Sequence, residues 1–75
     1  SSTNSEQTAE ATSYKFGYSL YLAYKAIGLH ENFEAAKNYA IDIFKELSYE
    51  FDENAFTKAW NDAQNGKEPE YNPFY

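Results

Sequence analysis

The sequence predicts an all-α fold: a small three-helix bundle with a polar N-terminal arm and an extended aromatic C-terminal tail. In three segments, apolar residues recur every three or four positions, which is the spacing of one face of an α-helix. Both prolines, Pro69 and Pro73, follow the third segment, where they would prevent a helix from continuing. No segment alternates apolar and polar residues for more than a few positions, as a half-buried strand would.

The length of 75 residues allows one domain, which we divide into an arm (1–8), a three-helix domain (9–66) and a tail (67–75). A domain of this size buries only about 60% of the surface that its unfolded chain exposes. The chain has no Cys, so no disulfide and no Cys-based metal site can stabilise it. Packing of the core therefore has to supply the stability.

We expect the first helix to begin between residues 5 and 12 and to extend to Ile27. Gly28 suits the left-handed conformation that commonly follows a helix, and Leu29 would then fold back onto Tyr24. The residues predicted to share the core face of this helix are Phe16, Leu20, Ala23, Tyr24 and Ile27.

The second helix has the clearest amphipathic pattern in the chain. Asn32 is a suitable N-cap, because its side chain can accept a hydrogen bond from the first turn. Polar residues occupy the side of this helix that faces away from the predicted core. The core stripe is predicted to contain Phe33, Ala36, Ala40, Ile43, Phe44 and Leu47.

The third helix is expected to begin after Asp52 as N-cap, with the negative charge of Glu53 in its first turn, and to end before Gly66. Phe51 and Phe56 have the spacing of a hydrophobic staple, in which a residue before the cap packs on the fourth helical residue. The predicted buried face consists of Ala55, Phe56, Ala59, Trp60 and Ala63.

The aromatic content is the main indication of function. Eight Tyr, six Phe and one Trp are more rings than so small an interior is expected to shelter. Exposed aromatic clusters usually mark contact sites, and Tyr suits an interface that is partly wet. We therefore predict a partner-binding surface on a second stripe of the first helix together with the tail. Its residues are Tyr14, Tyr18, Tyr21, Leu22, Tyr71, Phe74 and Tyr75.

A simpler interpretation of the same residues remains open. The long aromatic side chains of the tail could fold back and cover the tyrosine stripe of the first helix. Burying one aromatic side chain favours such docking by roughly 1.5–3 kcal/mol before the cost of ordering the tail.

An acidic patch is predicted between the second and third helices. Its residues are Asp42, Glu46, Glu50, Asp52 and Glu53. Such a patch would attract a basic surface on a partner, mainly by raising the rate of association. The alternative is an ordinary solvated face in which Asp52 and Glu53 serve the start of the third helix.

Several classes of function find no support in the sequence. The net charge of −6 and the absence of Arg disfavour contact with a phosphate backbone, so we expect no nucleic-acid partner. No apolar run approaches the ~20 residues of a membrane span. The single His30 at a helix junction cannot complete a ligand set, and no catalytic, metal or cofactor site is predicted.

These observations lead to one functional hypothesis and two alternatives. The hypothesis is a small acidic non-enzymatic protein of inhibitor or immunity type, which binds another protein through the tyrosine-rich helix face. The alternatives are an acidic mimic that blocks a DNA- or RNA-binding protein, and a surface or structural module that self-associates. The polar Ser- and Thr-rich start favours a secreted or cell-surface protein, and the oligomeric state stays open.

Overall fold

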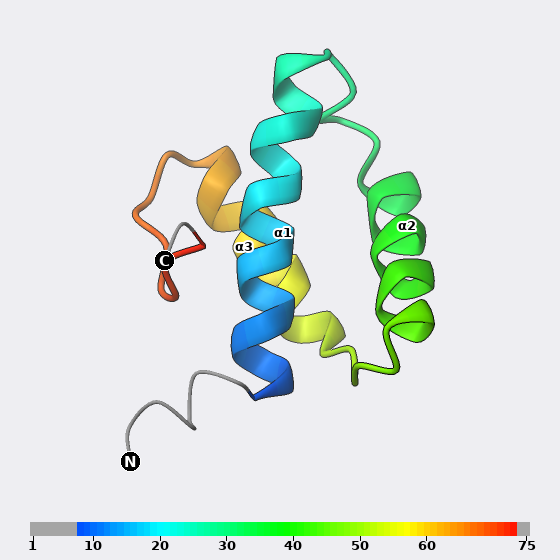
Figure 1. Ribbon diagram of the computed structural model, residues 1–75. Coiled ribbons are helices and arrows are strands. Elements are labelled where there is room, and N and C mark those ends of the chain that lie inside the picture. The colour runs from blue at the N-terminus through cyan, green and yellow to red at the C-terminus, as the bar shows by residue number, and fades with distance from the viewer. Residues whose placement is uncertain (1–7, 74–75) are drawn as a thin grey trace.

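The computed structural model describes residues 8–73, which form three α-helices joined by turns (Figure 1). The helices are α1 (Ala9–Ala26), α2 (Phe33–Glu46) and α3 (Glu53–Gln64). No strand occurs within residues 8–73, so the predicted all-α class is confirmed. Most of the predicted N-terminal arm lies outside the described residues.

Each helix begins at a polar residue whose side chain accepts a hydrogen bond from a backbone N–H three residues later. Thr8, Asn32 and Asp52 occupy these positions, at distances of 3.1, 3.3 and 3.1 Å. The N-caps predicted at Asn32 and Asp52 are therefore confirmed. The Asp52 cap is also held in place from α1, because its own N–H donates to the buried Ser13 hydroxyl at 2.8 Å.

The three helices also end in the same way. Gly28, Ser48 and Gly66 follow the ends of α1, α2 and α3 with φ of 80°, 61° and 73°. In each case the next residue donates its N–H to the carbonyl five residues back, at 2.8, 2.8 and 2.9 Å. This is the Schellman arrangement. Gly28 and Gly66 confirm the predicted ends, whereas Ser48 is a non-glycine residue in a conformation that suits glycine.

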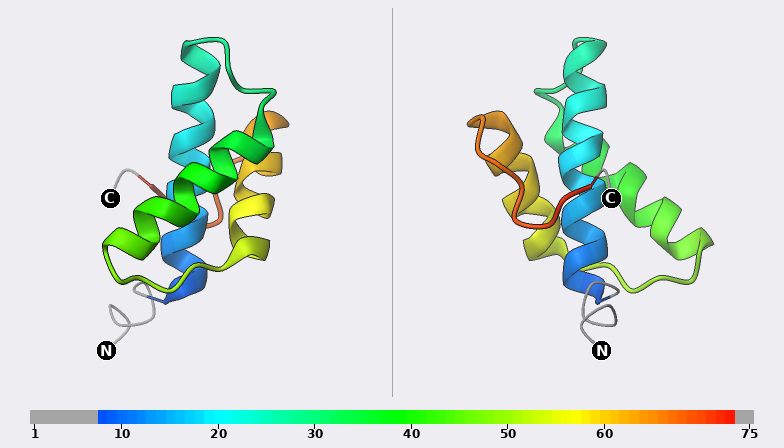
Figure 2. Two further views of the ribbon diagram at one scale, coloured as in Figure 1. Left: turned by 90° about the vertical axis from the view of Figure 1, so that its right-hand side faces the viewer. Right: turned by 60° about the vertical axis from the view of Figure 1, so that its left-hand side comes forward.

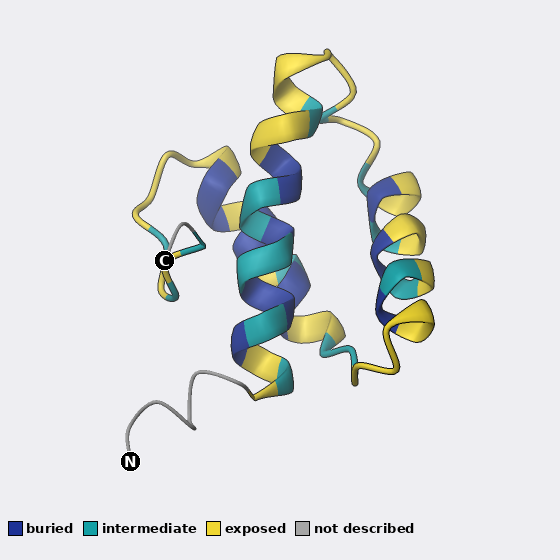
Figure 3. Ribbon diagram, viewed as in Figure 1, coloured by how far each residue is buried: buried dark blue, intermediate teal, exposed yellow. Residues whose placement is uncertain are grey.

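α1 and α3 pack closely because α1 carries Gly17 at their contact. A Cβ at position 17 would lie 2.9 Å from Phe56 Cδ1, 3.0 Å from the Phe56 carbonyl oxygen and 3.1 Å from Ala59 Cβ. Any larger residue at position 17 would force Phe56 or its neighbours in α3 to shift, so glycine permits this close approach. Figure 3 shows the buried faces of the two helices turned toward each other.

α2 crosses the other side of this pair obliquely (Figure 2) and is held mainly by aromatic side chains. Phe33 contacts Trp60 at a centroid distance of 5.6 Å, and Phe44 contacts Phe51 at 5.2 Å. The predicted staple is present, since Phe51 and Phe56 lie 5.5 Å apart. Figure 3 shows that the outer side of α2 is exposed.

The predicted core face of α1 is partly wrong. Leu20 is buried and Phe16 and Tyr24 are half-buried, but Ala23 is exposed and Ile27 is 66% exposed. The last turn of α1 extends beyond the ends of both neighbouring helices (Figure 1), so neither α2 nor α3 covers it. The residues of α1 that are buried are Ala11, Ser13, Tyr14, Gly17, Leu20 and Tyr21.

The predicted faces of α2 and α3 agree better with the structure. All five residues predicted for the buried face of α3 are buried. In α2, Ala36, Ala40 and Phe44 are buried, whereas Leu47 at the end of the stripe is exposed. Leu47 is the C-cap residue that follows the last helical residue of α2, and its side chain is 55% exposed.

Candidate functional site

Tyr14 lies in the interior and connects α1 to α3 and the tail. Its side chain is 1% exposed, and its hydroxyl donates to Asp62 Oδ2 at 2.6 Å. The same hydroxyl accepts the N–H of Glu70 at 2.9 Å. The ring of Tyr71 packs edge-on against it at 5.6 Å. Tyr14 therefore acts as an internal anchor for residues 70–71.

The electrostatics of this cluster stabilise a neutral tyrosine beside a charged aspartate. Burial, assisted by the hydrogen bond to Asp62, raises the pKa of Tyr14 to about 12. The hydrogen bond from Tyr14 lowers the pKa of Asp62, against the effect of burial. Lys58 adds to this lowering because its Nζ lies 3.1 Å from Asp62 Oδ2.

The expectation of an open tyrosine strip on α1 is wrong at two of its members. Besides Tyr14, Tyr21 is only 3% exposed, since its ring packs against Trp60 at 5.0 Å. Tyr18 is half-buried and donates its hydroxyl to the Lys67 carbonyl oxygen. The tail folds back from the end of α3 toward α1 (Figure 2), as the simpler interpretation of these residues requires.

The other predicted contact residues have different positions. Leu22 is exposed, and Tyr71 is half-buried by its contact with Tyr14. Phe74 and Tyr75 lie outside the described residues. Tyr14 thus packs against both Tyr18 and Tyr71, whereas Tyr21 packs against α3.

The predicted acidic patch separates into structural and free residues. The Asp52 side chain caps α3, and Glu53 pairs with Lys37 at 3.1 Å. Asp42 and Glu46 are exposed one turn apart on α2, and Glu50 is exposed in the turn that follows. Asp42, Glu46 and Glu50 therefore make no hydrogen bond or ion pair through their carboxylates within the described part of the chain.

An apolar groove between α1 and α2 is the first candidate site that the sequence did not indicate. Its volume is about 300 Å³, and Phe16, Ile43, Phe44, Leu47 and Tyr49 form most of its apolar wall. Leu47 and Tyr49 are each 55% exposed. The groove is therefore open to solvent beside two large apolar side chains.

The edges of this groove combine aromatic and acidic groups. Tyr39 is exposed on α2 and stacks on Phe16 at a centroid distance of 6.4 Å, which extends the apolar surface. Asp42 and Glu46 precede the groove residues Ile43 and Leu47 by one position each, so they lie on the adjoining, solvent-facing side of α2. The α2 side of the groove is thus bordered by negative charge.

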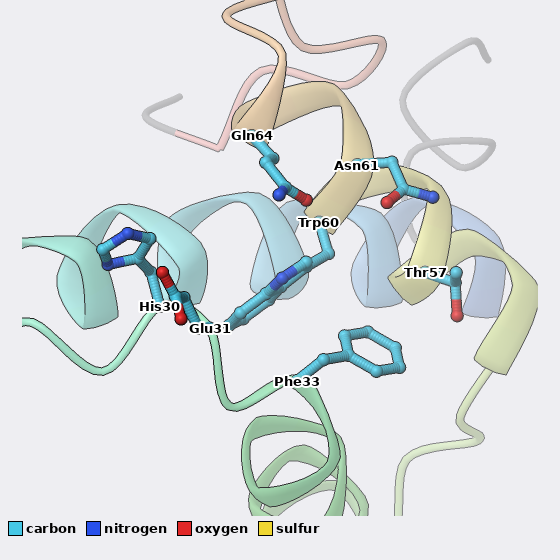
Figure 4. Close-up of a pocket in the computed structure, with 7 residues that line it drawn as sticks. All are labelled: His30, Glu31, Phe33, Thr57, Trp60, Asn61 and Gln64. Carbon is cyan, nitrogen blue, oxygen red and sulfur yellow. The ribbon is translucent and has the colours of Figure 1, made fainter.

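A second pocket, of about 270 Å³, lies around Trp60 on the side of α3 near the start of α2. In Figure 4 the Trp60 indole lies at its centre, with His30 and Glu31 to one side and Thr57 to the other. Asn61 and Gln64 project from α3 above the indole. Nδ1 of His30 is buried and has no hydrogen-bond partner within residues 8–73.

Asp62 is an important residue whose role was not predicted. The sequence did contain an indication of this role. Asp62 lies seven residues after Ala55 and three after Ala59, which places it on the predicted buried face of the third helix. An acidic residue in such a row requires a polar partner, and Tyr14 and Lys58 supply it.

Neither a search for membrane spans and metal sites nor comparison with known proteins assigns a function to the groove or the pocket. Within residues 8–73, no helix is long and apolar enough to cross a bilayer. No three His, Cys, Asp or Glu side chains of this part of the chain are grouped so that they could hold a metal ion. Protein-family models, curated protein sequences and solved structures give no match to this chain.

Proposed function

We propose that this chain is a small acidic, non-enzymatic protein of inhibitor or immunity type, which binds another protein through the groove between α1 and α2. The observation that carries the proposal is the exposed apolar surface around this groove. Two large apolar side chains, Leu47 and Tyr49, remain open to solvent there. Most of the described aromatic rings of this small protein are instead buried or half-buried. Contiguous apolar surface with a polar rim is typical of contact sites.

The charge around the groove indicates the chemistry of the partner. Asp42, Glu46 and Glu50 lie next in sequence to groove residues of α2 and the turn that follows it, whereas Lys15 of α1 is the one charged side chain among the described residues that lines the groove itself. A partner segment whose apolar side chains enter the groove and whose Lys or Arg side chains face the carboxylates on the α2 side, away from Lys15, would fit this arrangement. The net charge of −6 would attract such a segment over a longer range.

This proposal changes the predicted contact surface while retaining part of it. Tyr14 and Tyr21 are left out, because their rings are buried. Leu22 is retained, since it is exposed on α1 three residues after Ser19, which lines the groove. Tyr18 and Tyr71 are secondary candidates, because each is half-buried.

Site-specific photocrosslinking tests the proposal. A photoreactive phenylalanine analogue placed at Leu47 should give a discrete adduct with one other protein in extract of the source organism. The same analogue at Lys45, which is exposed on another side of α2, is the matched control and should give little adduct. Mutation of Tyr49→Ser should reduce the Leu47 adduct by roughly tenfold, as expected for a contact residue worth ~1.4 kcal/mol.

Three other results would contradict this function. Equal adducts at positions 47 and 45 would mean that the groove has no specific occupant. An adduct with a second copy of this chain would favour a module that self-associates. An adduct that disappears steeply with salt but is unaffected by Tyr49→Ser would favour an acidic mimic, in which carboxylates provide the affinity.

A further inference from the structure

We propose that the aromatic ring of Phe74 occupies the groove between α1 and α2 in the free protein and competes there with the partner. Phe74 itself lies outside the described residues. Its place is inferred from the residue before it and from the chemistry of the groove. The competition rests on the proposed function of the groove, whereas the occupancy is measured on the isolated chain.

The described part of the tail leads to this groove. The Glu70 N–H donates to the Tyr14 hydroxyl at 2.9 Å and the Tyr71 ring packs against Tyr14, which fixes the tail on α1. Figure 2 shows the tail crossing from α3 to α1. Pro73, the last described residue, is half-buried and lines the groove. The residue that follows Pro73 is therefore attached at the edge of the groove.

The short connection gives the next side chain a large advantage over a free ligand. Phe74 follows Pro73 directly, and consecutive Cα atoms lie about 3.8 Å apart. The ring of Phe74 therefore stays close to a groove that Pro73 already lines. A group tethered in this way has an effective concentration on the order of millimolar.

The groove can receive a phenyl ring. Its volume is about 300 Å³, and its apolar side chains Ile43, Leu47 and Tyr49 are half-buried or exposed, so a further ring can reach them. Phe74 has no polar group in its side chain. It can be buried there without leaving a hydroxyl unpaired, as Tyr75 would.

Occupancy by Phe74 would lower the apparent affinity of the groove for any partner. If the ring fills the groove for about four fifths of the time, only the remaining fraction can bind, and the apparent affinity falls roughly fivefold. The tail would thus keep the apolar surface covered until a partner displaces it.

NMR of the isolated full chain tests the occupancy. With labelled Ile and Leu methyl groups, we expect nuclear Overhauser contacts from the Phe74 ring to Ile43 and Leu47. Phe74→Ala should shift both methyl signals, because the ring current is lost. Tyr75→Ala is the matched control and should shift them much less. The methyl groups of Ile27, which is 66% exposed and does not line the groove, should not shift in either variant.

Two results would overturn the occupancy. One is the absence of these contacts, or equal effects of the two variants on Ile43 and Leu47. The other is a contact that appears only between a labelled and an unlabelled copy, because the occupant would then be the tail of a second copy.

The photoreactive analogue at Leu47 tests the competition. Adding Phe74→Ala should raise the adduct with the other protein roughly fivefold when that protein is not saturating, and Tyr75→Ala should leave it nearly unchanged. No increase with Phe74→Ala overturns the competition even where the NMR contacts are present. No adduct from any of these forms contradicts the proposed function, and the competition with it, whereas NMR still decides the occupancy.

Discussion

At the scale of single residues, the aromatic excess of this chain is used mainly to build its interior. Tyr14 and Tyr21 are tyrosines with internal roles: one pairs with Asp62 and the other packs on Trp60. Tyr can do this in a small core because the ring fills space and the hydroxyl pairs with a polar group. A count of rings therefore does not by itself measure the size of a contact surface.

Mutation of Tyr14→Phe should destabilise the protein by about 1–3 kcal/mol, because Asp62 loses a buried partner and the Glu70 N–H loses its acceptor. The measurement is urea unfolding near neutral pH. Tyr39→Phe is the control, since that residue is exposed and its loss of a hydroxyl should leave stability nearly unchanged.

The same variant tests the pKa of Tyr14. The folded pKa of about 12 exceeds the ordinary value of 10.0, so the neutral form is favoured in the folded state. This contribution to stability is complete below pH 10.0 and is lost as the pH rises through about 12. The unmutated chain should therefore lose more stability across this range than Tyr14→Phe. Parallel losses in the two proteins would argue against a raised pKa.

At the scale of the elements, the helix ends are set by the same geometry with different residues. Gly28 and Gly66 adopt positive φ without a Cβ, whereas Ser48 adopts φ of 61° with one. A left-handed residue other than glycine costs roughly 1–2 kcal/mol of local strain. The strained residue lies between Leu47 and Tyr49, which both line the groove.

Mutation of Ser48→Gly should stabilise the protein by about 0.5–1 kcal/mol, because the gain from relieved strain exceeds the entropy that glycine adds to the unfolded chain. Gly28→Ser makes the reverse change at the end of α1 and should destabilise by a similar amount. Thermal unfolding of the two variants is the comparison. If both variants changed the stability in the same direction, positive φ at positions 28 and 48 would not be what determines the stability of these two helix ends.

At the scale of the whole molecule, α1 and α3 form the close-packed pair, and the tail covers one side of it. α2 lies across the other side and leaves the apolar groove at its last turn. How far each helix extends along its neighbours thus determines which apolar side chains stay exposed.

A chain that ends at Glu68 should be less stable than the full chain by about 1–2 kcal/mol, since it lacks the Tyr71 ring and the Glu70 N–H that cover Tyr14. Helical content should be retained, because all three helices end before residue 65. The measurement is urea unfolding followed by circular dichroism. A chain that ends at Pro73 keeps both contacts and serves as the control; equal stability of the two would mean that the tail does not stabilise α1.

The sequence by itself determined the helices of this protein and most of what they bury. Caps at Asn32 and Asp52, ends at Gly28 and Gly66, and the buried faces of α2 and α3 follow from local rules, in which a residue acts on neighbours within one or two turns.

Only the tertiary structure decided which apolar side chains stay exposed. Nothing within α1 shows that its last turn, with Ile27, extends past its neighbours, or that Tyr14 faces Asp62 across 48 residues. The groove at Leu47 and the pocket around Trp60 likewise depend on the angle at which α2 crosses the α1–α3 pair. The exposure of a side chain depends on which segments, distant in the sequence, pack against it. Helical periodicity does not specify those contacts.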